Sequence, residues 1–177
     1  MLTMVIGGSG SGKSAYAEDL VLSLGEKKRL YIATMEVYDD ESRARVVKHR
    51  RQREGKGFET LEIPTHLERA MVPAGSTVLL ECMSNLVANE IFSPSGQAAD
   101  CVERIIAAVT AMSQSADVVV VTNDVFADGV IYDEYTTDYL KKMALVNAGL
   151  SDIADRVVEV VAGIPVIAKA PEESLAV

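Results

Sequence analysis

The sequence contains only two cysteines, Cys82 and Cys101, among its 177 residues. Two cysteines cannot build a disulfide framework, which indicates a reducing compartment and predicts a cytoplasmic protein. No run of 18 apolar residues occurs, so we expect no transmembrane helix and no stable membrane insertion. The first four residues carry no basic leader and lead directly into an apolar segment, which argues against a signal peptide.

Positive charge is also scarce, with 17 Lys and Arg against 26 Asp and Glu and a formal net charge of −9. Binding to nucleic acid needs a basic surface, so we expect no nucleic-acid partner. The few basic residues are concentrated in one segment, which contains Arg43, Arg45, Lys48, Arg50, Arg51, Arg53 and Lys56. This clustering indicates a local anionic ligand such as a triphosphate, although a solvated helix face is the commoner explanation of a charge run.

The sequence has no linker, internal repeat or low-complexity tract, which favours a single domain over residues 1–170 with a frayed tail at 171–177. Short apolar runs alternate with longer helical segments, which predicts an α/β domain whose mostly parallel sheet is flanked by helices. The predicted strands are 2–6, 30–34, 58–63, 77–82, 118–122, 157–161 and a short antiparallel edge strand at 166–168. The predicted helices are 13–24, 40–53, 67–72, 84–92, 98–115 and 133–153.

A glycine-rich segment follows the first predicted strand and leads into the first predicted helix. It consists of Gly7, Gly8, Ser9, Gly10, Ser11, Gly12, Lys13 and Ser14, and it matches the pattern G-x-x-x-x-G-K-[ST]. Glycines let backbone N–H groups cradle phosphates, and the helix N-terminus adds attraction for anions. We expect Lys13 to contact the β- and γ-phosphates from an exposed helix start, and the Ser14 hydroxyl to bind Mg²⁺. The motif predicts a P-loop NTPase-like (RecA-like) domain that binds a nucleoside triphosphate, and leaves the reaction open.

A P-loop normally works with an acidic residue at the end of a neighbouring strand, which helps to hold the metal. Glu81 closes the apolar run 77–82 and is the preferred candidate, because ligand sites of open α/β sheets lie at the carboxyl ends of strands. Asp124, which follows the strand 118–122, is the alternative. Asp117 precedes that strand and therefore lies at the opposite end. A strand-end carboxylate that merely caps a helix is the non-functional explanation for Glu81.

The basic segment contains a histidine that is a candidate nucleophile. Arg45, His49 and Arg53 are spaced i, i+4, i+8 and share one stripe of a helix. Neighbouring cations disfavour the protonated imidazole and would leave it neutral and nucleophilic, and they would also neutralise a triphosphate. From the residues alone, a surface histidine is the commoner case. The second histidine, His66, is interpreted as structural, beside a capping box formed by Thr65 and Glu68.

Several further motifs occur in a fixed order along the chain. They are Ala17-Glu18, Tyr31-Ile32-Ala33-Thr34, Asp39-Asp40-Glu41, Arg45-x-x-x-His49-Arg50, Leu79-Leu80-Glu81-Cys82 and Val121-Thr122-Asn123. Together with the P-loop they resemble the bifunctional adenosylcobinamide kinase / adenosylcobinamide-phosphate guanylyltransferase family of cobalamin biosynthesis, from residue 1 to about 169. The resemblance implies a transferase that phosphorylates adenosylcobinamide with GTP or ATP. It also implies that GMP passes from GTP through a guanylyl-histidine, here His49, to adenosylcobinamide phosphate, in a homotrimer.

The resemblance also implies which residues bind the nucleotide. Besides the P-loop they are Ala33, Thr34, Met35, Arg50, Arg51, Gln52, Arg53, Glu62 and Glu81. The sequence departs from the family pattern at Met35 and over 123–137, which concerns the corrinoid-facing part more than the nucleotide site. Two alternatives therefore stay open: a P-loop small-molecule kinase without guanylyl transfer, and a non-catalytic nucleotide-binding regulatory module.

Overall fold

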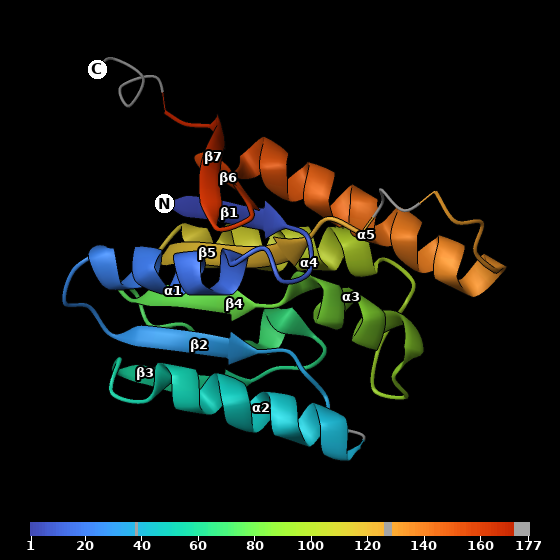
Figure 1. The fold of residues 1–177 in the computed structure, drawn as a ribbon, viewed down its shortest axis with the longest axis horizontal. Helices are drawn as coiled ribbons and strands as arrows, with labels where there is room; N and C mark the ends of the chain where they lie inside the picture. Colours follow the sequence, from blue (N-terminus) through green and yellow to red (C-terminus); the bar gives the residue numbers. More distant parts are fainter. Residues whose placement is uncertain (38, 126–128, 172–177) are drawn as a thin grey trace.

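The computed structural model describes residues 1–37, 39–125 and 129–171, and it forms one α/β domain around a seven-stranded sheet (Figure 1). The strand order is β3-β2-β4-β5-β1-β6-β7, with all neighbours parallel except β6 and β7. The strands are β1 (Leu2–Gly7), β2 (Arg29–Ala33), β3 (Phe58–Glu62), β4 (Thr77–Glu81), β5 (Asp117–Asn123), β6 (Arg156–Val161) and β7 (Ile164–Lys169). The predicted fold class and the antiparallel edge strand are confirmed.

Helices cover both faces of the sheet (Figure 1). They are α1 (Lys13–Ser23), α2 (Asp40–Arg53), the short 3₁₀ helix η1 (Leu67–Arg69), α3 (Met83–Phe92), α4 (Cys101–Ser113) and α5 (Glu134–Ile153). The helices α1 and α2 lie on one face, and α3, α4 and α5 lie on the other. Two apolar cores result, one on each side of the sheet.

The alternation of side chains along the strands determines which residues point to the face of the sheet that α1 covers. Leu80 and Val120 belong to the core under α4 and α5, while Leu79 and Val119 belong to the core under α1. Because successive residues of a strand point to opposite faces, Glu81 shares the α1 face with Leu79. The central strands are buried on both sides, as their continuous apolar runs predicted.

The predicted helix over Asp40–Arg53 has the bounds that the structure shows. The helix predicted at 67–72 is wrong beyond Arg69, because the chain continues with Ala70 in an extended conformation. The helix predicted at 98–115 begins only at Cys101, because Asp100 has a left-handed backbone with φ of 52°.

The predicted capping box is also wrong. His66, with φ of 56°, occupies the cap of η1 and makes no side-chain capping bond, and Thr65 Oγ1 lies 3.5 Å from Ser95 Oγ instead. Residues 172–177 of the predicted tail lie outside the described residues.

Candidate nucleotide and transfer site

The P-loop connects β1 to α1, and its glycines stand where the backbone requires them. Gly10 and Gly12 have φ of 71° and 90°, a left-handed region that strains residues with a Cβ. A Cβ on Gly7 would lie 2.6 Å from the carbonyl oxygen of Val160, so only glycine fits beside β6. The Ser11 carbonyl accepts a 2.8 Å hydrogen bond from the N–H of Gly163, which ties the loop to the β6–β7 turn.

Lys13 was expected at an exposed helix start, and this expectation is wrong. Its side chain is buried, with 8% of the residue exposed, and Nζ donates a 3.0 Å hydrogen bond to the Gly8 carbonyl inside the loop. Burial lowers the pKa of Lys13, while interactions with Cys82 and Glu81 oppose that shift. The lysine therefore lies between the P-loop and the end of β4.

Glu81 lies at the carboxyl end of β4, as predicted. The residue shares the face of α1 and is buried, with 8% of its surface exposed. The hydroxyl of Tyr31 on the neighbouring strand β2 donates a 3.0 Å hydrogen bond to its Oε2. Burial, and next the negative charge of Glu81, raise the pKa of Tyr31 far above its ordinary value, so the tyrosine remains a neutral donor. The guanidinium of Arg53 stacks on the aromatic ring of Tyr31, with Cζ 3.3 Å from the ring centroid.

A cavity of about 360 Å³ lies between α2 and the carboxyl ends of β2, β3 and β4. Seven of the predicted site residues line it: Ala33, Met35, His49, Arg50, Arg53, Glu62 and Glu81. Cys82, the neighbour of Glu81 in sequence, also lines the cavity. Glu81 itself lines the cavity, and its charge partly offsets the lowering of the pKa of Lys13, so the cavity and the P-loop lie close to each other at the end of β4.

His49 is half-buried on α2, and its Nδ1 is buried without a hydrogen-bond partner among the described residues. The cavity around it also contains Arg43, Arg50 and Arg53. Arg50 forms a 2.6 Å ion pair with Glu62, so this carboxylate positions an arginine at the cavity wall. A polar nitrogen beside several guanidinium groups is an arrangement suited to phosphate chemistry.

The remaining predicted residues lie outside this cavity. Thr34 is fully buried, and its hydroxyl pairs with the backbone of Cys82, accepting from N at 2.8 Å and donating to O at 2.9 Å. Arg51 is exposed and lines a separate hollow beside β3. The side chain of Gln52 lies outside the described part of the chain. Asp117 lies at the opposite end of the sheet, as predicted, paired with Lys27 at 2.6 Å and with the N-terminus.

Sequence reasoning missed two sets of polar residues at the site. Tyr31 was treated only as part of a motif, and its contact with Glu81 depends on the pairing of β2 with β4, which the sequence does not show. The second set is Cys82, Ser84 and Asn123, at the carboxyl ends of β4 and β5. These residues come together because β4 and β5 are neighbours in the sheet, and the sequence motifs do not predict that pairing.

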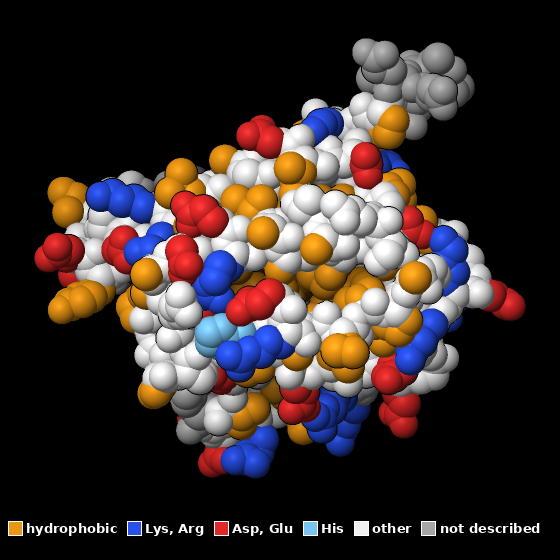
Figure 2. All heavy atoms as spheres, turned by 180° about the vertical axis from the view of Figure 1, so that it is seen from behind, with side chains coloured by type: hydrophobic (Ala, Val, Ile, Leu, Met, Phe, Trp, Pro, Cys, Tyr) orange, Lys and Arg blue, Asp and Glu red, His pale blue; other side chains and the backbone are white. Residues whose placement is uncertain are grey.

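The other hollow of interest lies on the opposite face, between η1 and α4, where apolar side chains gather (Figure 2). It has a volume of about 400 Å³, and Leu67, Val72, Ala108 and Met112 contribute to its lining. Arg104 at its border is already engaged by acidic side chains, so the described residues of this hollow offer no free cation for a phosphate.

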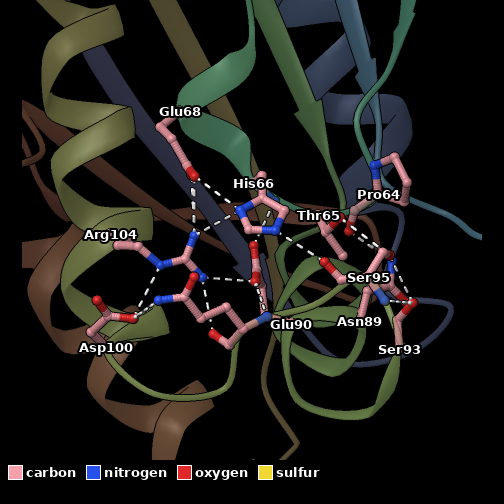
Figure 3. A network of polar contacts seen from close by, with 11 residues as sticks. Pro64, Thr65, His66, Glu68, Asn89, Glu90, Ser93, Ser95, Asp100 and Arg104 are labelled. Carbon is pink, nitrogen blue, oxygen red and sulfur yellow. Dashed lines mark hydrogen bonds and ion pairs between the residues drawn. The ribbon is translucent and has the colours of Figure 1, made fainter.

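A dense polar network surrounds Arg104 and includes His66 (Figure 3). The fully buried carboxylate of Glu90 accepts hydrogen bonds from Arg104 Nη2 at 2.8 Å and from the backbone N–H of His66 at 2.6 Å. The His66 ring contacts Glu68 at 3.0 Å and the Ser95 carbonyl at 3.0 Å. Through these contacts His66 links the loop after β3 to the connection between α3 and α4. This agrees with the interpretation of His66 as a structural residue.

Within the described residues, no group of three or more His, Cys, Asp or Glu side chains is placed to hold a metal ion. Over the same residues, no helix is both long and apolar enough to cross a membrane.

The fold and the loop define a P-loop NTPase-like domain of the RecA-like class, and solved structures agree. One solved ATPase domain superposes with a TM-score of 0.58 at 10% identity, covering 97% of this chain and 77% of that one. The flagellar accessory protein FlaH from Methanocaldococcus jannaschii gives a TM-score of 0.54 at 12% identity, covering 96% and 78%. At these identities the likeness establishes the fold alone.

Sequence comparison establishes the family. The family described as cobinamide kinase / cobinamide phosphate guanyltransferase matches residues 3–167. The bifunctional adenosylcobalamin biosynthesis proteins CobU of Escherichia coli K12 and of Salmonella typhimurium LT2 are each 34% identical to this chain, with 94% of the chain and 98% of each relative covered. The corresponding protein CobP of Pseudomonas aeruginosa is 28% identical, with 93% and 95% covered. The chain belongs to the cobinamide kinase / cobinamide phosphate guanyltransferase family and is a transferase.

Proposed function

We propose that this chain phosphorylates adenosylcobinamide with a nucleoside triphosphate and then transfers GMP from GTP, through a guanylyl-histidine at His49, to adenosylcobinamide phosphate. Family membership supports the pair of reactions. The observation that carries the assignment of residues is the position of His49 in an arginine-lined cavity that adjoins Lys13 at the end of β4.

In the kinase step, the hydroxyl oxygen of the substrate attacks the γ-phosphorus, the bond to the β–γ bridging oxygen breaks, and the hydroxyl proton is released. The P-loop backbone holds the triphosphate, and Lys13 exchanges the Gly8 carbonyl for phosphate oxygens. Ser14 and Glu81 supply a hydroxyl and a carboxylate, which are the hard oxygen ligands that Mg²⁺ prefers. The ion would neutralise phosphate charge there when bound.

In the transfer step, a neutral ring nitrogen of His49 attacks the α-phosphorus of GTP, and pyrophosphate leaves with the electrons of the α–β bridging bond. The guanidinium groups of Arg50 and Arg53 stabilise the charge that develops on the phosphate oxygens. A phosphate oxygen of adenosylcobinamide phosphate then attacks the same phosphorus, and the P–N bond to His49 breaks. The cavity wall formed by Ala33 and Met35 would receive the guanine nucleotide.

We further propose that the protein works in the cytoplasm as a homotrimer that takes GTP or ATP. This proposal is supported by family resemblance and by the small number of cysteines.

The bifunctional enzyme, a kinase without guanylyl transfer and a regulatory module differ in which molecule receives a radioactive label from GTP. With Mg²⁺ and corrinoid substrate, α-labelled GTP should label the protein transiently, and γ-labelled nucleotide should label the corrinoid. Transfer of the γ-label without any α-labelled protein would favour a kinase that lacks guanylyl transfer. Binding of GTP without either transfer would favour a regulatory module and contradict the proposal.

A further inference from the structure

The helix α2 carries His49, but it has little apolar surface with which to pack on the sheet. Only three of its residues are apolar, namely Ala44, Val46 and Val47. Among the α2 side chains that the structure describes, only that of Arg53 is buried, with 7% of the residue exposed. Since helices of this length are held in proteins by tertiary packing, the position of His49 depends on the contacts of Arg53.

Arg53 packs on the aromatic ring of Tyr31, which is held in place from two directions. The guanidinium carbon lies 3.3 Å from the ring centroid, and the tyrosine on β2 is itself buried. The Tyr31 hydroxyl donates to Glu81 at 3.0 Å, and the ring meets Phe58 of β3 edge to face, with centroids 6.3 Å apart. The ring is therefore a fixed platform for the end of α2.

The other described side-chain contacts near this end of α2 constrain it less. Arg50 pairs with Glu62 at 2.6 Å, but both side chains are more than half exposed, and such pairs contribute little to stability. Lys56 pairs with the buried carboxylate of Glu18 at 2.5 Å, but it lies beyond the end of the helix and ties the following loop to α1. Among the described contacts, the stack on Tyr31 is therefore the one that fixes α2 to the interior of the domain.

Arg53 is also placed to take part in the chemistry of the cavity. It lies one helical turn after His49, on the same face of α2, and both residues line the cavity. The Nη1 of Arg53 is buried and has no hydrogen-bond partner among the described residues. A buried guanidinium donor without a partner favours an anion, and phosphate oxygens match its planar geometry. The Tyr31 ring thus holds an unused donor beside the proposed nucleophile.

We propose that Tyr31 is a positioning residue for guanylyl transfer, whose ring holds the Arg53 guanidinium against the α-phosphate of GTP. The inference rests on the proposed function and adds a residue to it. As the bond from His49 to the α-phosphorus forms and the α–β bridging bond breaks, negative charge grows on the phosphate oxygens. A donor that is already in place stabilises this charge without reorganisation, and a misplaced donor does not. Because Tyr31 acts through Arg53, its loss should lower kcat more than it raises the KM for GTP.

The test compares Tyr31→Leu with Tyr31→Phe. Neither new side chain can donate to Glu81, so the two variants differ in the aromatic ring under Arg53. Guanylylation of the protein at saturating GTP and Mg²⁺, followed by intact mass, should be about 100-fold slower in Tyr31→Leu than in Tyr31→Phe, the scale of a misplaced catalytic group. The kinase kcat values of the two variants should agree within about threefold, because the γ-phosphorus reacts at the P-loop.

A double-mutant cycle shows whether Tyr31 acts through Arg53. Arg53→Met should slow guanylylation about 100-fold in the wild type but less than about threefold further in Tyr31→Leu, because the guanidinium there is already out of place. Val158→Ala is the stability control, since Val158 on β6 is fully buried in the same core as Tyr31. It should lower the melting temperature and leave guanylylation within about threefold of wild type.

Equal guanylylation rates of Tyr31→Leu and Tyr31→Phe would overturn the proposal, as would an undiminished effect of Arg53→Met in the Tyr31→Leu background. A kinase difference between the two tyrosine variants as large as the guanylylation difference would show a general structural effect and overturn it as well. The same holds for a loss of guanylylation in Val158→Ala as large as that in Tyr31→Leu. A wild type that forms no guanylyl adduct would instead overturn the proposed function.

Discussion

Removal of the Arg104 guanidinium would leave a carboxylate in the interior without its cationic partner. The side chain of Glu90 is fully buried, and besides Arg104 it accepts hydrogen bonds from the backbone N–H groups of His66 and Gln97, at 2.6 and 2.9 Å. Arg104→Met keeps the aliphatic stem and removes the charge. The variant thus isolates the electrostatic contribution of the network in Figure 3.

Breaking a buried ion pair by removing one partner usually costs about 3–5 kcal/mol. We expect about 3 kcal/mol here, because two backbone donors to Glu90 persist. For a chain of this size such a loss lowers the melting temperature by roughly 6–12 °C. Arg104 also donates to the Gln97 carbonyl and pairs with Asp100, and these contacts are partly accessible to water and contribute less.

Urea unfolding at pH 7 measures this loss directly. Lys28→Met is the matched control, since Lys28 forms an exposed 2.8 Å pair with Glu59 and should lose less than about 1 kcal/mol. Combining Arg104→Met with Glu90→Gln should cost less than the sum of the single losses, because an uncharged glutamine no longer needs a cation. An Arg104→Met loss no larger than that of Lys28→Met would refute the reasoning.

Three further predictions concern the site and the N-terminus. Lys13→Ala should abolish both transfer activities, and near-normal turnover would remove the P-loop from the mechanism. In urea titrations the variant should change the free energy of unfolding by less than about 1 kcal/mol, because the Gly8 carbonyl that Lys13 contacts can bind water instead. Glu81→Gln keeps an acceptor for Tyr31 and should raise the Mg²⁺ concentration needed for half-maximal turnover, whereas an unchanged metal dependence would assign the role to Asp124. Hydrogen bonding from Lys27, followed by that from the N-terminus, lowers the pKa of Asp117, so its stabilisation is present above the unfolded value of about 3.9 and is lost as pH falls through the folded value. Asp117→Asn should therefore be less stable than wild type by roughly 1 kcal/mol at pH 7 and equally stable at pH 2, as measured by urea unfolding; a deficit that persists at pH 2 would contradict the ion-pair explanation.

Local chemistry explains which parts of the fold the sequence predicted well. The helix Asp40–Arg53 is predicted with its observed bounds because Asp39 forms a capping box with Ser42, and Gly55 follows the last turn. The P-loop is equally local, since its glycines, lysine and serine are consecutive. Such features depend on neighbours in the sequence and can be read from it.

Features that depend on tertiary contacts could not be predicted. The burial of Lys13, the contact between Tyr31 and Glu81, and the stacking of Arg53 on Tyr31 all arise when separate strands and helices meet. The overlong helix predicted at 67–72 has a similar origin. Its apolar residues serve the core under α4, where Leu67 is buried and Ala70 and Val72 pack against it without a helical period.

Peptide mapping by mass spectrometry after incubation with GTP and Mg²⁺ tests the central claim most directly. We predict a mass gain of one guanylyl group on His49, lost in acid and stable in base as expected for a phosphorus–nitrogen bond to imidazole. No adduct should form in His49→Asn, which keeps the size and polarity of the side chain and should still phosphorylate the corrinoid. An adduct on Lys48 instead, or undiminished guanylyl transfer by His49→Asn, would contradict the account.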